Sequence, residues 1–197
     1  MELISIFDYT GAYLMKICIL PGVGYQSSEP DYPLIQALKE NNTVVYFDWS
    51  NKRLLHLYLI KPFLSNYVRE ILLDFQQAIL HGNTITLPEA DLYIGHSAGG
   101  LIAATTNKPA IFLGTPFHMV MQVGTSDVNS LISKPFRRLN IVNIYDIFSE
   151  GTVGLTNMEY KSSLLSKYLP WLAHVDYWNN SKVITTILDF IKELKGE

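Results

Sequence analysis

The sequence has little of what disulfide-bonded and membrane-spanning proteins depend on. It contains one cysteine in 197 residues, Cys18, so no disulfide can form within the chain. Cys18 lies inside an apolar run, which indicates a buried thiol without a catalytic role. A single unpaired cysteine suits a reducing compartment. No stretch reaches about 18 uninterrupted apolar residues, so we expect no transmembrane helix.

The first residues also lack the pattern of a secretory signal. Acidic Glu2 stands where a signal peptide carries basic residues, and Asp8 and Gly11 interrupt the apolar positions. We therefore expect a cytoplasmic protein. The apolar segment 3–7 predicts either an extra edge strand or an extension that precedes Met15.

The chain has neither a strong net charge nor a cluster of metal-binding side chains. Its formal net charge is −3 and charged residues make up 17%. Lys and Arg are dispersed, so we expect no nucleic-acid partner, and the pair Arg137-Arg138 is predicted to be solvated. The five histidines are scattered and no H-E-x-x-H sequence is present, so we expect no metal and no cofactor.

What the sequence does contain suits one apolar globule. Hydrophobic residues make up 48%, and no low-complexity run or internal repeat is present, so a single domain is expected over 1–197. Apolar runs predict strands, and a period of about 3.6 residues predicts the helices between them. Strands are expected at 16–20, 43–47, 92–94, 110–113 and 139–145, and helices at 32–41, 62–81, 98–106, 160–168 and 179–194.

This alternation of strands and helices indicates an α/β fold. Strands that are apolar on both faces are typical of a mostly parallel sheet with helices on both faces. Two segments interrupt the alternation. Residues 149–156 carry Gly and Thr turn signals, and 115–138 is irregular, which predicts a lid or an insertion over the strand ends.

One short motif carries a chemical signal. Gly95-His96-Ser97-Ala98-Gly99 follows a short apolar strand and precedes a helix start rich in small residues. A serine hydroxyl attacks a carbonyl well when a sharp strand-to-helix turn exposes it beside a base. Such a turn requires small residues two positions before and after the serine, as Gly95 and Gly99 provide. The spacing alone arises in roughly 5% of chains of this length, and a plain Gly-Ser turn is the structural alternative.

A glycine-containing segment follows the first predicted strand. Pro21-Gly22-Val23-Gly24-Tyr25 allows backbone N–H groups to turn toward a ligand. A catalytic loop, a phosphate-binding loop and a plain turn are the three interpretations. The Gly-Lys-Ser/Thr of a Walker loop and the third glycine of a dinucleotide-binding fingerprint are absent.

Three residues occur in the order serine, acid, histidine. Ser97, Asp146 and His174 each follow a strand-like run, where open parallel sheets place their sites. With the segments GHSAG, LPGVG, LGTPFH, NIYD and HVDYW, this order resembles the compact lipases and esterases of the α/β-hydrolase superfamily, from Met15 to the end of the chain. The resemblance implies an α/β-hydrolase fold with Ser97 as nucleophile, Asp146 as acid and His174 as base.

The same resemblance implies where a negatively charged oxygen would be bound during catalysis. It assigns this role to the backbone N–H groups of Val23 and Ala98, because the loop after the first strand and the residue after the serine supply the donors. The chain departs from the family at Pro21, where many relatives have histidine, and at Met119, where a glycine often follows the histidine of LGTPFH.

Each proposed role has an alternative. His174 also fits a buried core histidine, and His118 is the next candidate base. Asp146 also fits a turn cap. The other candidates are Asp127 and Glu150 as reserve acids, His96, which is expected to point away from the serine, and His56 and His81, which are expected at the surface.

The expected chemistry is cleavage of a carboxylic ester, small or lipid-like, through an acyl-serine intermediate. A thioesterase, an amidase or a peptidase would use the same residues, and a non-catalytic binding protein with this fold is the alternative outside catalysis. The candidate substrate-binding residues are Tyr25, Phe117, His118, Met119 and Trp171. The neighbouring apolar residues Val120, Met121, Tyr177 and Trp178 fit either an acyl pocket or the core.

Overall fold

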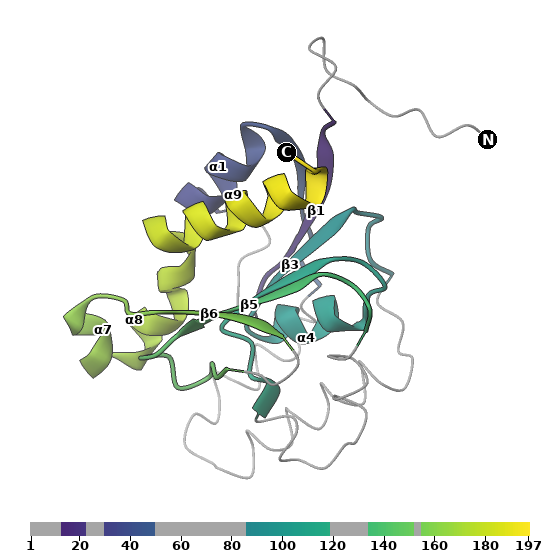
Figure 1. The fold of residues 1–197 in the computed structure, drawn as a ribbon. Helices are drawn as coiled ribbons and strands as arrows, with labels where there is room; N and C mark the ends of the chain where they lie inside the picture. Colours follow the sequence, from purple (N-terminus) through teal and green to yellow (C-terminus); the bar gives the residue numbers. More distant parts are fainter. Residues whose placement is uncertain (1–12, 23–29, 50–85, 119–133, 152–154) are drawn as a thin grey trace.

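A parallel sheet forms the centre of the computed structural model, which describes residues 13–22, 30–49, 86–118, 134–151 and 155–197. Within those ranges the sheet has six strands in the order β2-β1-β3-β4-β5-β6 (Figure 1). Every neighbouring pair is parallel. The strands are β1 (Met15–Leu20), β2 (Asn42–Tyr46), β3 (Leu92–His96), β4 (Ala110–Leu113), β5 (Arg138–Asn143) and β6 (Thr156–Tyr160).

Helices cover both faces of this sheet, which confirms the predicted α/β class. Helices α1 (Pro33–Lys39) and α9 (Ser181–Lys195) lie over one face, and α4 (Ala98–Thr105) lies over the other (Figure 1). The short helices α7 (Leu164–Tyr168) and α8 (Pro170–Val175) and the 3-10 helix η1 (Asp176–Trp178) lead from β6 to α9. Among the helices that the structure describes, none has the length and apolar character needed to cross a membrane.

The side chains of β1 show why the sheet needs helices on both sides. Successive side chains of a strand point to opposite faces. Ile17 and Ile19 therefore join the core cluster under α1 and α9, while Cys18 and Leu20 join the cluster under α4. All four side chains are fully buried. Each buried Ile or Leu contributes about 1.5–3 kcal/mol, so both helical layers stabilise β1.

Helix α9 has a defined start and a defined end. The Asn180 side chain accepts two backbone N–H bonds from the first turn, and Gly196, with a φ of 80°, ends the helix in the left-handed region. Val183, Ile187 and Ile191 are buried on one face, so α9 packs along the sheet. The caps and the apolar face together hold η1, which directly precedes α9, against the carboxyl ends of the strands.

The five strands predicted from the sequence are confirmed as β1 to β5, with small shifts at their ends. The sequence predicts turns at 149–156 and a helix over 160–168, whereas β6 occupies Thr156–Tyr160 and the helix begins at Leu164. Strand β6 lies at the edge of the sheet and its side chains are mostly exposed and polar, so no apolar run marks it. The predictions for 3–7 and 62–81 lie outside the described residues.

Arg138 corrects the prediction of a solvated arginine pair. Arg137 is exposed and forms an ion pair with Glu193, but Arg138 is 5% exposed. The Arg138 guanidinium donates to the carbonyls of Ala104 and Thr106, at 3.2 and 3.0 Å, where the carboxyl end of α4 leaves carbonyl groups without helical partners. Burial lowers the pKa of Arg138, and the partial negative charge of the helix end stabilises its cation.

The strand order reverses beside β1, and this reversal distinguishes the carboxyl ends of β1 and β3 from those of the other strands. The chain passes from β1 to β2 and returns to the other side of β1 as β3. In open parallel sheets, ligand crevices form at the carboxyl ends of the strands where the order reverses. Pro21 and Gly22 follow the carboxyl end of β1, and Ser97 follows the carboxyl end of β3.

Gly99 provides a test of how closely β1 and α4 approach each other. A Cβ atom on Gly99 would overlap the carbonyl oxygen of Leu20 and would lie 2.5 Å from that of Pro21. We therefore expect Gly99→Ala to lower the free energy of unfolding by about 1–3 kcal/mol, although alanine favours a helix by about 1 kcal/mol over glycine. Urea unfolding followed by circular dichroism measures the change.

Gly151→Ala is the matched control for this substitution. A Cβ atom on Gly151 would meet its nearest neighbour, Glu159 Oε1, at 3.7 Å, which is an ordinary contact. The control is expected to change stability little. Unchanged stability in Gly99→Ala would contradict the backbone contact between β1 and α4.

Candidate active site

Ser97 occupies a strained turn between a strand and a helix. Strand β3 ends at His96 and α4 begins at Ala98, so the chain reverses within one residue. Ser97 has a φ of 53° and is the sole non-glycine residue with positive φ among those described. Such a conformation costs about 1–3 kcal/mol and is concentrated at functional sites. The Ser97 N–H donates to the Leu113 carbonyl at 2.8 Å, and its side chain remains partly exposed.

Small residues allow β3, α4 and β1 to meet at this turn. A Cβ atom on Gly95 would lie 2.5 Å from the Cα atom of Gly100, and one on Gly99 would overlap the Leu20 carbonyl. The motif predicts the need for Gly95 and Gly99. The structure adds Gly100, where a Cβ atom would overlap the hydroxyl of Thr115.

Gly22, two residues after the end of β1, lies close to the serine. A Cβ atom on Gly22 would lie 2.9 Å from the Cβ of Ser97 and 3.3 Å from Nδ1 of His96. Ala98, the second predicted oxyanion donor, is the first residue of α4, where backbone N–H groups have no helical partner. The first predicted donor, Val23, lies outside the described residues.

Asp146 and His174 are paired and buried. Nδ1 of His174 lies 2.9 Å from Oδ2 of Asp146, and the two residues are 5% and 3% exposed. Because an ionised carboxylate can only accept, Nδ1 of His174 carries the proton, and the lone pair of the imidazole is left on Nε2. The structure thus joins the acid and the histidine predicted from the sequence.

Tyr177 and Phe148 supply further donors to the same carboxylate. The Tyr177 hydroxyl donates to Oδ2 of Asp146 at 2.9 Å, and the Phe148 N–H donates to Oδ1 at 3.0 Å. Gly114, with a φ of 56°, makes room for this cluster, because a Cβ atom there would lie 2.7 Å from Oδ2 of Asp146 and 2.8 Å from Cε2 of Tyr177. A side chain at position 114 would collide with this cluster, which explains the glycine in LGTPFH.

Asn143, the last residue of β5, ties the histidine segment to the sheet. Its side-chain amide donates to the Ala173 carbonyl and to the Ser162 hydroxyl, both at 2.9 Å. Phe148 packs edge-on against the His174 ring, with centroids 4.9 Å apart. The position of His174 is thus set by the ends of β5 and β6.

His96 corrects the expectation that its side chain points away from the site. Its buried ring packs against the His174 ring, with centroids 4.7 Å apart, and Nε2 of His96 lies 2.6 Å from the His174 carbonyl oxygen. Since a carbonyl only accepts, His96 donates this bond. Burial, and secondarily the neighbouring His174, lowers the pKa of His96 to about 3. A neutral His96 next to Ser97 in the chain therefore holds the main chain of His174.

Two predicted substrate-binding residues are assigned other contacts. Phe117 is 1% exposed and packs edge-on against Phe112 in the core, so it is a core residue. His118 is half-buried, with Nδ1 3.7 Å from the carboxylate of Glu150, so this reserve base and reserve acid lie beside each other.

Tyr177 and Trp178 are fully buried and belong to the core. Tyr25, Met119, Asp127 and the side chain of Trp171 lie outside the described residues, as does 119–133 of the predicted lid.

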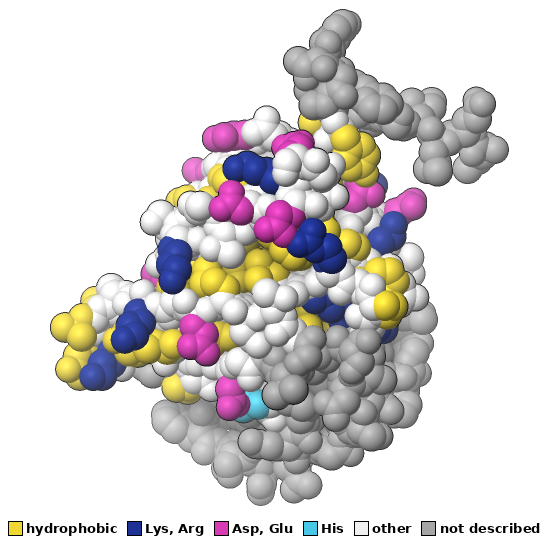
Figure 2. Space-filling model, in the orientation of Figure 1, with side chains coloured by type: hydrophobic (Ala, Val, Ile, Leu, Met, Phe, Trp, Pro, Cys, Tyr) yellow, Lys and Arg dark blue, Asp and Glu magenta, His cyan; other side chains and the backbone are white. Residues whose placement is uncertain are grey.

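Apolar side chains are exposed on the helices that precede His174. Figure 2 shows hydrophobic side chains, with lysines among them, at the projecting end that Figure 1 labels α7. We call this set the α7–α8 apolar surface: Leu164, Leu165, Tyr168, Leu169 and Leu172, which are 37–70% exposed. Ile147, next to Asp146, is 64% exposed. Exposed apolar side chains thus flank both the acid and the histidine.

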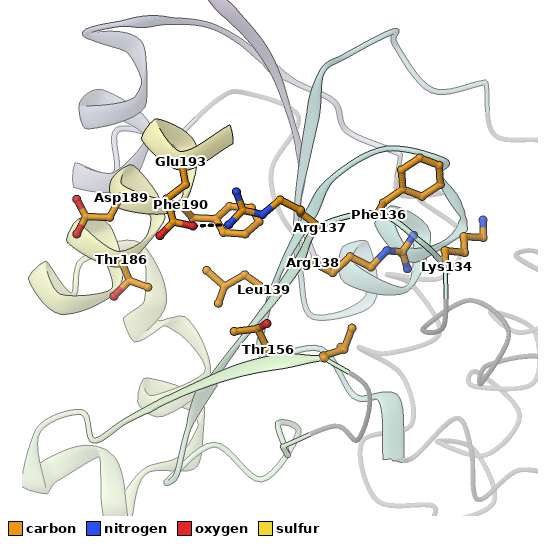
Figure 3. Close-up of a pocket in the computed structure, with 11 residues that line it drawn as sticks. Lys134, Phe136, Arg137, Arg138, Leu139, Thr156, Thr186, Asp189, Phe190 and Glu193 are labelled. Atoms are coloured by element: carbon orange, nitrogen blue, oxygen red, sulfur yellow. Dashed lines mark hydrogen bonds and ion pairs between the residues drawn. The ribbon is translucent and has the colours of Figure 1, made fainter. Parts of the chain in front are cut away.

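A pocket of about 420 Å³ lies at the amino-terminal ends of the strands, where β5 and β6 begin (Figure 3). Its cations already have partners. Lys134 donates to the Thr105 carbonyl, next to the bonds of Arg138, and Arg137 lies over the ring of Phe190 at 5.3 Å. From Arg138 to Asn143, the first and last residues of β5, the strand spans about 17 Å, so this pocket and the Ser97 site lie at opposite ends of the sheet. In the described part of the chain, no group of three or more metal-ligating side chains comes together.

No protein-family model matches the sequence, and no curated protein matches it. The interpretation of the site therefore depends on its geometry. A partly exposed serine lies beside a helix start, next to a residue that holds a histidine whose Nδ1 is bonded to a buried carboxylate. Such an arrangement can remove a proton from a hydroxyl, stabilise the imidazolium with a buried carboxylate, and stabilise an oxyanion with backbone N–H groups.

The low pKa of His96 leads to a prediction about stability and pH. An unfolded histidine titrates near 6.5 and folded His96 near 3, so between these values the unfolded chain binds one more proton. Stability is therefore complete above about pH 6.5 and falls as the pH decreases toward 3. We expect the wild type to lose up to about 1.4 kcal/mol per pH unit more than His96→Gln in this window.

Urea unfolding of both proteins between pH 4 and 8 checks this expectation. Glutamine retains an N–H donor for the His174 carbonyl but does not titrate. The two stability curves should run parallel above pH 7 and converge below it. Parallel curves over the whole range would show that His96 takes up its proton at the same pH in the folded and the unfolded protein.

Proposed function

We propose that the protein is a serine hydrolase of the α/β-hydrolase type that cleaves carboxylic esters through an acyl-serine intermediate. The observation that carries this proposal is the junction of Ser97 and His174 through His96. Ser97 has an unusual backbone conformation, and the neighbouring His96 holds a histidine whose Nδ1 is bonded to buried Asp146. A structural Gly-Ser turn would not require this combination.

The proposed first step forms the acyl-enzyme. Oγ of Ser97 bonds to the carbonyl carbon of the ester while Nε2 of His174 takes the hydroxyl proton, and Asp146 stabilises the resulting imidazolium. The negative oxygen is stabilised by the N–H of Ala98, aided by the positive end of α4, and by the N–H of Val23. When the carbon–oxygen bond to the alcohol breaks, His174 returns the proton to the departing oxygen.

The second step releases the acid by the same route. His174 takes a proton from water, the hydroxide bonds to the acyl carbon, and the bond to Ser97 breaks as the proton returns to its oxygen. The partial exposure of Ser97 is compatible with entry of an ester and of water. No metal or cofactor is required for either step.

The surroundings of the site favour an ester with an apolar part. Along the chain, the helices that carry the α7–α8 apolar surface lead to His174, and the exposed Ile147 follows Asp146. Apolar side chains around polar reacting groups are typical of sites for small organic ligands. We therefore propose an apolar or lipid-like acyl group, and a cytoplasmic location in keeping with the buried, unpaired Cys18. Thioesters and amides would use the same chemistry.

The first test of this proposal is Ser97→Ala. We expect the variant to keep its circular dichroism spectrum and to lose ester hydrolysis by on the order of 10⁴-fold to 10⁶-fold, since the nucleophile acts together with its base. Rates on p-nitrophenyl esters from acetate to palmitate measure this loss and the preferred chain length. A fluorophosphonate probe should label the wild type stoichiometrically and Ser97→Ala not at all.

Ser181→Ala is the control, because Ser181 is an exposed serine at the start of α9. It should hydrolyse esters and be labelled as the wild type is. Absence of labelling in the folded wild type from neutral to alkaline pH would favour the non-catalytic binding protein instead.

A second test separates the proposed acid from its reserve. Asp146→Asn should preserve the shape of the site but favour the wrong tautomer of His174, so we expect kcat/KM to fall by up to about 10⁴-fold. Without the charge of Asp146, the imidazolium of His174 is less stable. The residual rate should therefore rise at alkaline pH. Glu150→Gln should change the rate little, because Glu150 lies near His118. Profiles of kcat/KM from pH 6 to 10 provide the comparison, and a large loss in Glu150→Gln alone would move the acid to that residue.

A further inference from the structure

We propose that Tyr177 is a positioning residue that holds Asp146 and limits how strongly Asp146 attracts the proton of His174. This role rests on the proposed hydrolase function, because it acts through the acid and the base of that reaction. Oδ2 of Asp146, the oxygen that accepts from His174, also accepts from the Tyr177 hydroxyl. Two donors therefore share one carboxylate oxygen.

The direction of each hydrogen bond follows from its partners. The Asn143 backbone N–H lies 3.0 Å from the Tyr177 oxygen and can only donate to it. The single hydroxyl proton of Tyr177 is therefore directed to Asp146, at 2.9 Å. The resulting chain runs from the end of β5 through Tyr177 to Asp146, where it meets the proton of His174.

The packing around Tyr177 keeps its hydroxyl in this place. Tyr177 is fully buried, its ring packs edge-on against Tyr160 with centroids 5.6 Å apart, and Gly114 leaves no room for movement toward β4. Burial, with the nearby charge of Asp146, raises the pKa of Tyr177 far above its ordinary value. The Tyr177 hydroxyl thus keeps its proton, and remains a donor, at neutral pH.

Among the described residues, few other ionisable groups face this pair. His174 meets His96 from β3 and Asp146 from the loop after β5, and Asp146 in turn meets Tyr177 from η1. Behind Tyr177, Tyr160 of β6 lies near Asp176. His96 and the two tyrosines are neutral at neutral pH, so of these neighbours Asp146 is the one whose charge acts directly on His174.

A hydrogen bond to a carboxylate withdraws part of its negative charge. With Tyr177 in place, Oδ2 of Asp146 stabilises the His174 imidazolium less than a carboxylate without that donor would. Removal of the hydroxyl has two consequences. The carboxylate loses one of the bonds that orient it, which slows the chemical step, and its attraction for the His174 proton increases.

Tyr177→Phe tests this inference. We expect kcat to fall by about 10-fold to 100-fold, the value of a hydrogen bond to a charged group, with KM unchanged. We also expect the acidic limb of the kcat/KM profile to move to higher pH. The midpoint of the His174 ring resonances in an NMR titration should move in the same direction, and this measurement does not require turnover.

Tyr160→Phe is the matched control, because it removes another buried tyrosine hydroxyl from the same cluster. It should leave the pH profile and the NMR midpoint as in the wild type. Should Tyr177→Phe fail to fold, 3-fluorotyrosine at residue 177 keeps the shape and makes a stronger donor. It should move the NMR midpoint to lower pH, opposite to the effect of phenylalanine.

Equal midpoints and equal acidic limbs in the wild type, Tyr177→Phe and the fluorotyrosine protein would overturn the positioning role and leave Tyr177 as a core residue. Failure of the hydrolase proposal has a different signature. In that case the wild type shows no ester hydrolysis and Ser97 is not labelled, whatever the NMR titration shows.

Discussion

The contact between the end of β1 and the start of α4 is the constraint on which the site depends. Gly99 lies so close to the carbonyl of Leu20 that no side chain fits between them. The helix must therefore begin directly after β3, and Ser97 is left to make the whole turn in a strained conformation. In a sheet with the strand order reversed at β1, this contact places the serine at the edge where β5 also ends.

A buried carboxylate imposes the second requirement. An ionised group inside a protein costs several kcal/mol unless donors surround it, and Asp146 accepts bonds from Phe148, Tyr177 and His174. These donors come from the loop after β5 and from two segments before α9. The cap and apolar face of α9 thus contribute to the site, because they hold in place the chain that carries His174 and Tyr177.

Much of this arrangement could be predicted from residue types, and the errors have two physical origins. Strands β1 to β5 carry apolar runs, whereas β6 at the edge does not. The order of Ser97, Asp146 and His174 predicts the pairing of acid and histidine, whereas the directions of the His96 and Arg138 side chains depend on alternation along their strands. Ile94 belongs to the core cluster under α9, so alternation along β3 places His96 on that same face. Leu139 lies in that cluster as well, which directs Arg138 to the opposite face, toward α4.

The alternation along β1 has a practical consequence for the chemistry of the molecule. Cys18 lies under α4, is fully buried, and has its pKa raised to about 12 chiefly by burial. A thiol reagent needs a thiolate that it can reach, so modification of Cys18 requires the sheet to separate from its helices. The rate of that reaction measures how often the folded molecule opens. Cys18, on an inner strand of the sheet, can therefore report how often the folded protein opens.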